Sequence, residues 1–126
     1  MSPFPSTLRA KRFTVAEMAR KVLSLETLVN DLQHMALDLD RQISAEEERT
    51  RCKDPADVVY SSSAQAMTAR RAKLLHSVAD LRVRLVMARR ELEQAEAELR
   101  ALESTGTHDP SREVTHRRIS TNAHPS

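Results

Sequence analysis

The sequence is poor in the residues that build turns, sheets and aromatic cores. Its 126 residues include one glycine, no tryptophan, one tyrosine and two phenylalanines. One glycine excludes a glycine-rich phosphate loop and a dinucleotide-binding fingerprint, because each needs several glycines at set spacings. A turn-rich β-sandwich is excluded for the same reason, and strand-favouring aromatic residues are nearly absent.

Cysteine and long apolar runs are also scarce. The single Cys52 excludes an intramolecular disulfide, which is typical of a reducing compartment. No apolar run approaches the roughly 18 residues that span a bilayer, and residues 1–5 lack the apolar stretch of a signal peptide. We therefore expect a one-domain cytoplasmic chain with no direct membrane insertion.

The abundant residues are those that favour helices. Ala, Leu, Arg, Glu and Lys make up 61 of the 126 residues, a share typical of long helices and coiled coils. The 20 basic and 18 acidic residues leave a net charge of +2. That balance argues against nucleic acid as a partner, since nucleic-acid binding needs a one-sided basic surface.

A heptad repeat predicts a first long helix over residues 7–51. Every position of its apolar seam between Met18 and Ile43 is apolar, which is typical of a coiled coil. Two prolines predict an extended segment at residues 1–6. The seam positions are Leu8, Lys11, Val15, Met18, Val22, Leu25, Val29, Leu32, Ala36, Leu39, Ile43 and Glu46.

A second seam predicts a second helix over residues 63–104. Asp54-Pro55 interrupts the helical pattern, so residues 52–62 form the turn, and Ser62 to Gln65 resembles a capping box. Thr105-Gly106 predicts the helix stop, and residues 105–126 have the composition of a disordered tail. The second seam contains Ala64, Met67, Arg71, Leu74, Val78, Leu81, Leu85, Ala88, Leu92, Ala95, Leu99 and Leu102.

The charges decide how the two helices pair. Residues 9–21 and 70–90 are basic, whereas 22–48 and 91–103 are acidic. An antiparallel arrangement sets each basic block against an acidic one. The predicted fold is therefore all-α, with two long helices forming an antiparallel coiled-coil hairpin. One register pairs Leu32 with Val78, and a shift of one heptad is also allowed; in the first, Arg71 needs Asp40 or Glu47 as a partner.

No group of residues predicts an active site, a cofactor site or a metal site. His34 and His76 are isolated, and His108, His116 and His124 are eight residues apart with no supporting cysteine. Cys52 has no neighbouring histidine to act as a base. We therefore expect a protein that is not an enzyme.

Apolar residues outside the seam are the candidates for contact with other proteins. Leu23, Leu28, Met35, Leu37 and Leu75 lie off the seam, and so does an outer apolar stripe formed by Val83, Val86 and Met87. Such residues are either exposed without a binding role or part of a surface that docks another protein, and their grouping favours docking. Val58-Val59-Tyr60 at the turn could equally plug the hairpin end or contact a partner.

The order of several short motifs resembles the FliJ family, the central-stalk proteins of flagellar type III export. The resemblance covers about residues 8–103. It rests on the segment from Leu8 to Val15, on Met35 to Asp40, on Asp54-Pro55-Ala56 with Tyr60, and on Arg70-Arg71 followed by Leu74-Leu75. Family members usually extend the second helix with a charged continuation, and Gly106, Pro110 and a Ser/Thr/His tail replace it here.

The resemblance implies a non-enzymatic stalk with three kinds of partner: the hexameric export ATPase, the cytoplasmic domain of the export-gate membrane protein, and export chaperones. It also implies peripheral association with the inner membrane. By position, the ATPase-ring end would carry Arg9, Lys11, Arg12, Phe13, Leu99 and Leu102. The gate side would carry Met35, Leu39, Tyr60, Arg70, Arg71 and Leu75.

Two other functions stay open. A generic helical-hairpin adaptor would self-associate or bind a partner helix through the outer apolar stripe. Nucleic-acid binding through Arg82, Arg84, Arg89 and Arg90 is the weaker candidate, because the acidic block should neutralise those groups.

Overall fold

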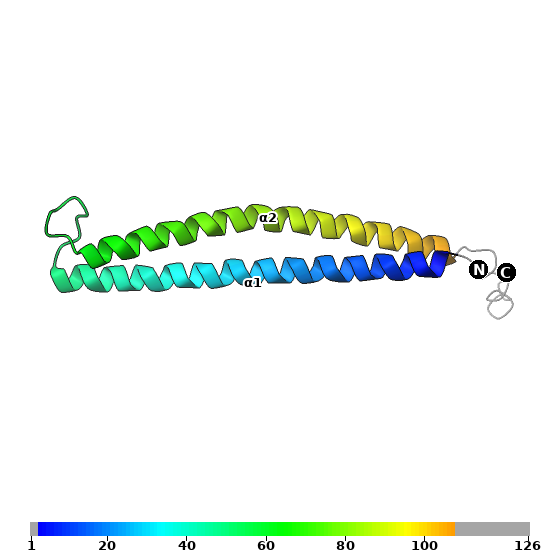
Figure 1. Cartoon of the computed structure of the whole chain (residues 1–126), viewed down its shortest axis with the longest axis horizontal. Coiled ribbons are helices and arrows are strands. Elements are labelled where there is room, and N and C mark those ends of the chain that lie inside the picture. The colour runs from blue at the N-terminus through cyan, green and yellow to red at the C-terminus, as the bar shows by residue number, and fades with distance from the viewer. Residues whose placement is uncertain (1–2, 108–126) are drawn as a thin grey trace. The chain divides into compact units, whose positions relative to one another are not determined.

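A computed structural model describes residues 3–107 as two long α-helices and a connecting turn. Helix α1 spans Phe4–Thr50 and helix α2 spans Ser62–Thr107. The two helices pack against each other in opposite directions as a coiled-coil hairpin. Figure 1 shows both helices, coloured along the chain. The predicted fold class is confirmed. The predicted disordered tail, from residue 108 onward, lies outside the described residues.

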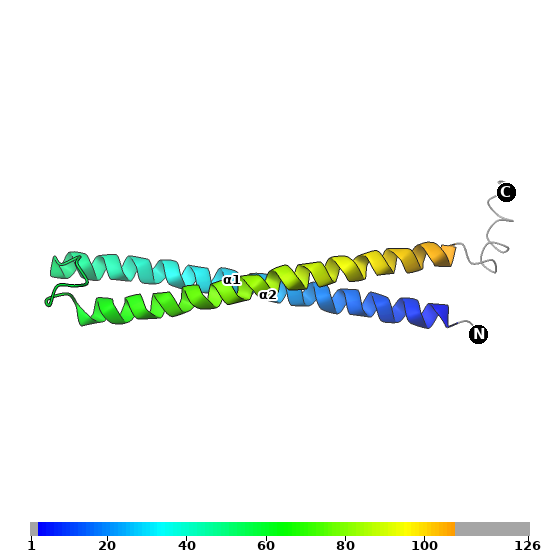
Figure 2. The ribbon, with the colours of Figure 1, turned by 90° about the horizontal axis from the view of Figure 1, so that it is seen from above.

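The chain divides into two compact parts, which we describe separately. The terminal part comprises Pro3, residues 4–21 of α1 and residues 88–107 of α2. The turn part comprises residues 22–87, with the segment 51–61 joining the ends of α1 and α2 (Figures 1 and 2).

The seam of the turn part is the predicted one. Val22, Val29, Ala36 and Leu39 are buried on α1, and Val78, Leu81 and Leu85 are buried on α2. Val29, Val78 and Leu81 form one cluster, with Leu25 and Leu32 packed against it. This cluster selects the register that sets Leu32 beside Val78, which the seven-residue repeat had left open.

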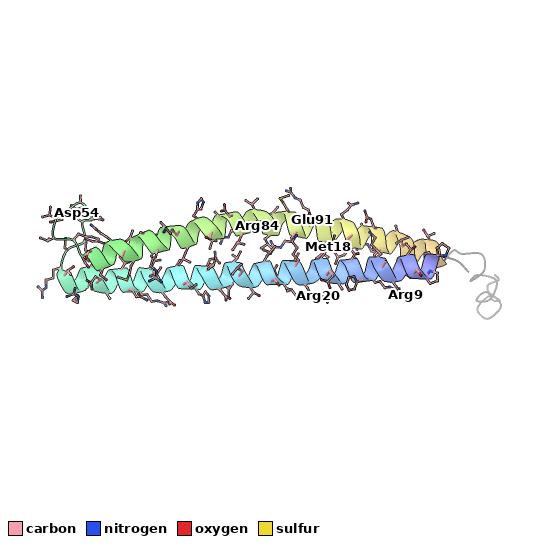
Figure 3. All side chains as sticks on the ribbon, in the orientation of Figure 1. Arg9, Met18, Arg20, Asp54, Arg84 and Glu91 are labelled. Atoms are coloured by element: carbon pink, nitrogen blue, oxygen red, sulfur yellow. The ribbon has the colours of Figure 1, made fainter. Side chains whose placement is uncertain are left out.

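The seam of the terminal part is less deeply buried. Ala88 and Ala95 are buried, whereas the larger seam residues of this part are half-buried, including Met18, which Figure 3 labels on α1. Alanine lets the backbones approach closely but removes little apolar surface from water. The seam of this part therefore removes less apolar surface from water than the seam of the turn part.

Both ends of α1 differ from the prediction. The helix begins at Phe4, three residues earlier than expected, because proline is tolerated in a first helical turn that needs no N–H donor from it. The amide of Thr7 donates to the carbonyl of Pro3 at 3.0 Å and closes that turn. At the other end, Arg51 adopts a left-handed conformation with φ of 55°.

Arg51 and Cys52 close α1 with a Schellman motif. The amide of Arg51 donates to the Glu48 carbonyl at 3.3 Å, and the amide of Cys52 donates to the Glu47 carbonyl at 3.2 Å. These two bonds satisfy carbonyls that the helix end would otherwise leave unpaired. Glycine usually occupies the left-handed position, so the sequence carried no signal for this cap, although Asp54-Pro55 predicted the helix end to within one residue.

The N-terminus of α2 lies one residue before the predicted capping box. The Ser61 hydroxyl accepts a hydrogen bond from the amide of Ala64 at 3.2 Å, so Ser61 is the N-cap and Ala64 occupies the third helical position. At the C-terminus, α2 continues through Gly106 to Thr107, where a stop was expected. No glycine with positive φ occurs in the described chain, so Gly106 is helical and forms no left-handed cap.

Candidate functional site

The turn is an ordered structure built from two consecutive β-turns. Asp54 and Asp57 begin these turns, and their carbonyls accept from the amides of Asp57 and Tyr60, both at 3.0 Å. The carboxylate of Asp54 accepts from the amide of Ala56, and that of Asp57 from the amide of Val59, again at 3.0 Å. An aspartate that bonds its own backbone two residues on stabilises such a turn.

A polar network ties this turn to the end of α1. The hydroxyl of Tyr60 donates to Glu47 Oε2 at 2.6 Å, and the hydroxyl of Ser61 donates to Glu46 Oε2 at 2.6 Å. Hydrogen bonds from Arg49 and then from Ser61 lower the pKa of Glu46 to about 2. The hydrogen bond to Glu47, reinforced by burial, raises the pKa of Tyr60.

The structure separates the three residues that the sequence grouped at the turn. Tyr60 is buried in a cluster with Cys52 and Ala64, so its ring plugs the hairpin end. Val58 and Val59 point outward, with 97% and 66% of their surface exposed. Tyr60 therefore supports the turn, and the two valines form its exposed tip.

The remaining residues predicted for the gate side divide between two grooves of the turn part. Met35, Leu39 and Arg70 line a groove of about 430 Å³ together with Asp38, Gln42, Lys73, Leu74 and Ser77. Arg71 and Leu75 line another of about 410 Å³, with Leu37 and His34. Leu39 is buried, so it forms a groove floor rather than a contact surface.

Arg71 is the polar residue in the α2 seam, and it has the partner that the sequence suggested. Its guanidinium Nε forms an ion pair with the Asp40 carboxylate of α1. Both side chains keep more than a third of their surface exposed. The charged group therefore leaves the seam sideways while the stem of Arg71 stays half-buried.

The residues of the predicted ATPase-ring end differ in exposure and in whether they already form an ion pair within the hairpin. Lys11 donates to Glu98 at 2.6 Å and Arg12 to Glu103 at 3.2 Å, as the charge blocks predicted. Leu99 and Leu102 are half-buried in the seam. Phe13 is 64% exposed, and Arg9, labelled in Figure 3, contacts Ser6 on its own helix.

The basic block of α2 is only partly neutralised in the turn part. Arg82 and Arg84 form no ion pair with a described residue, although the acidic block of α1 was expected to pair with them. The outer apolar stripe is also exposed to solvent, since Val83, Val86 and Met87 are 62%, 44% and 55% exposed. These side chains make the turn part the richer of the two in unpartnered groups.

The described chain offers no site for metal chemistry or membrane insertion. Within residues 3–107, no three His, Cys, Asp or Glu side chains gather closely enough to hold a metal ion. Neither described helix combines the length and apolar character needed to cross a bilayer. His108, His116 and His124 lie outside the described residues.

Comparison of the chain with protein-family models, with curated proteins and with solved structures gives no match.

Proposed function

We propose that this chain is a non-enzymatic stalk protein of flagellar type III export, which couples the hexameric export ATPase to the export-gate membrane protein. The observation that carries the proposal is the antiparallel hairpin spanning the segments that resemble the FliJ family. A coupling protein needs contact surfaces and a stable scaffold, but no cleft for catalysis. The apolar seam and the exposed side chains suit that task.

The exposed residues suggest how the two contacts would be divided. Phe13 and Arg9 belong to the terminal part and would bind the ATPase ring, since an exposed aromatic ring with a nearby guanidinium is a typical interface anchor. Met35, Arg70 and Leu75 belong to the turn part and would bind the export gate or chaperones. Leu39, Tyr60, Leu99 and Leu102 would support these surfaces from within.

The first test is export in a strain that carries an in-frame deletion of the gene. We expect secreted hook and filament protein to fall in the deletion strain and to recover when the intact gene is supplied. Complementation with Phe13→Ala should recover less export, whereas Leu23→Ala is a matched control because Leu23 is a similarly exposed residue of α1. Unchanged export in the deletion strain would overturn the proposal.

Binding to the ATPase gives a second, independent measurement. Co-sedimentation of purified chain with hexameric export ATPase should require Phe13, and circular dichroism should show that Phe13→Ala keeps its helix content. Leu32→Pro would break α1 at a cost of about 3 kcal/mol or more. If that variant were unfolded and still supported export, the hairpin could not be the stalk.

A generic protein-binding adaptor is the second candidate. The exposure of Val83, Val86 and Met87 on one stripe of α2 favours it, because single exposed apolar residues are common but groups of them mark docking faces. Normal export in the deletion strain, together with loss of a bound partner in Val86→Glu, would favour the adaptor.

A further inference from the structure

One side of the turn part carries exposed apolar and charged residues from both helices. The groove of about 430 Å³ places Met35 and Asp38 of α1 beside Arg70 and Lys73 of α2. Residues seven positions apart share a helix face. The same side therefore includes Leu28 and Asp31 on α1, and Asp80, Arg84 and Met87 on α2. We call these nine residues the Met35 face.

The apolar residues of the Met35 face are not covered by the hairpin itself. Leu28, Met35 and Met87 are 44%, 50% and 55% exposed. They sit outside the seam, where a self-contained two-helix coiled coil normally places polar residues. This arrangement is expected of a helix pair that packs against a further helical layer.

The charges of the Met35 face are mostly separated by helix. The α1 row carries Asp31 and Asp38, and the α2 row carries Arg70, Lys73 and Arg84 together with one acidic residue, Asp80. Asp38 contacts Arg41 on its own helix at 3.0 Å, and both of those side chains are more than 60% exposed. No described residue forms an ion pair with Asp31, Arg70, Lys73 or Arg84.

We propose that a second copy of this chain covers the Met35 face, forming a homodimer whose two-fold axis runs parallel to the helices. This axis lays α1 of each copy over α2 of the other, so the acidic row meets the basic row twice. A self-complementary contact of this kind is what a two-fold interface requires. The inference does not depend on the proposed role in export, and under both proposals Met35 and Arg70 would be available to the gate only in the monomer.

The alternative two-fold axis, perpendicular to the helices within the interface, is disfavoured by charge. It lays α1 over α1 and α2 over α2. Asp31 and Asp38 would then face the acidic row of the other copy, and Arg70, Lys73 and Arg84 would face a row that is basic except for Asp80. Like-charge juxtaposition at an interface costs several kcal/mol.

The register of the hairpin places the opposite charges at matching heights. Leu32 packs against the cluster of Val29, Val78 and Leu81, so in the register that pairs Leu32 with Val78 these two residues lie at about the same height. Asp38 is six residues beyond Leu32 and Lys73 is five residues before Val78, so their heights differ by about 1.5 Å. Asp31 and Arg84 differ by about 7.5 Å along the axis, a distance that an extended arginine side chain can bridge.

One contact of this dimer is unfavourable and provides a specific test. Asp80 shares the helix face of Lys73 and Met87 and lies near the height of Asp31. Its interaction with His76 spans 3.8 Å and requires a protonated imidazole. Removing the charge of Asp80 should therefore tighten the dimer.

The available area is sufficient for a stable dimer. About 27 residues of each helix in the turn part rise roughly 40 Å, and two helices side by side are roughly 20 Å wide. The resulting area of about 800 Å² per copy is what a standard protein–protein interface buries.

Sedimentation equilibrium of the full chain over a wide concentration range tests the proposal. We expect a monomer–dimer equilibrium that Met35→Glu and Lys73→Glu each weaken about tenfold or more. The double variant Asp38→Lys with Lys73→Glu should recover dimerisation, and Asp80→Asn should tighten it. Ala69→Glu is the control, because Ala69 is exposed on the outward side of α2 and lies outside both the Met35 face and the outer apolar stripe.

Circular dichroism should show unchanged helix content in each variant, since the substituted side chains are exposed. A chain that stays monomeric at every concentration would overturn the proposal, as would a dimer that Val83→Glu disperses and Met35→Glu does not. A failed charge swap, with both single variants folded and weakened, would reject the two-fold axis proposed here. Export by the deletion strain is measured separately, so the two proposals can fail independently.

Discussion

At the scale of single residues, Arg51 is the position where the backbone departs most from ordinary geometry. A left-handed conformation costs a residue other than glycine about 1–2 kcal/mol, and Arg51 has φ of 55°. We expect Arg51→Gly to raise the free energy of unfolding by about 1 kcal/mol, measured by urea denaturation. Ala45→Gly, in the helical interior of α1, should instead lower it by about 0.5–1 kcal/mol. A destabilised Arg51→Gly would contradict the Schellman cap.

Ser61 joins the start of α2 to the end of α1, so its loss should have two effects. Its hydroxyl caps Ala64 and also donates to Glu46. Ser61→Ala should cost about 1 kcal/mol through the lost cap. It should also raise the pKa of Glu46, since Ser61 is the second of the two donors that lower it. Chemical denaturation and NMR titration of Glu46 would measure the two effects.

The lowered pKa of Glu46 predicts the direction of an acid effect. Because the folded pKa is about 2 and the ordinary value is 4.5, the stabilising contribution is fully present above pH 4.5. It declines as pH falls from about 4.5 to about 2. Glu46→Gln should flatten this part of the pH profile, and an unchanged profile in that variant would assign the acid effect to other carboxylates.

At the scale of the element, the seam of α2 contains one position that is not optimised for stability. Arg71 occupies a seam position and pairs with Asp40, and both are more than a third exposed. An exposed ion pair contributes about 0.2–1 kcal/mol, whereas burying a leucine side chain contributes about 1.5–3 kcal/mol. We expect Arg71→Leu to stabilise the hairpin by about 1 kcal/mol in thermal or urea unfolding. A loss of stability would show that Arg71 sets the register of this layer.

In the turn part, the charged residues of α1 and α2 are only partly paired with each other. The acidic residues of α1 and the basic residues of α2 were expected to satisfy each other along the turn part. Instead Arg70, Lys73, Arg82 and Arg84 have no ion pair with a described residue. This surplus is why the proposed dimer interface lies in the turn part.

At the scale of the whole molecule, the ion pairs of the terminal part test the antiparallel arrangement directly. Lys11 and Glu98 are 87 residues apart in sequence and 2.6 Å apart in space, and the hydrogen bond from Lys11 lowers the pKa of Glu98. Lys11→Glu and Glu98→Lys should each lower the midpoint of thermal unfolding. The double swap should recover most of the loss, because opposite charges face each other again. Additive losses in the double variant would show that the two residues are not paired.

Much of this protein follows from its sequence alone. The scarcity of glycine and aromatic residues, the two heptad seams and the alternating charge blocks determined an all-α antiparallel hairpin, and every predicted seam position is buried or half-buried. This was possible because a coiled coil is specified by periodic local pattern, in which each residue's face depends on its position in the repeat. The exposure of Leu28, Met35, Val83 and Met87 followed from the same rule.

The tertiary structure determined the features that a seven-residue repeat does not specify, which are the register, the helix caps and the turn. A seven-residue repeat allows registers one heptad apart, and the packing of Leu32 with Val78 selects one of them. The closure of α1 by Arg51, the choice of Ser61 as cap, and the burial of Tyr60 beside exposed valines depend on hydrogen bonds across the turn. Such bonds join residues whose distance and orientation exist only after the helices have packed, which is why the heptad pattern does not specify them.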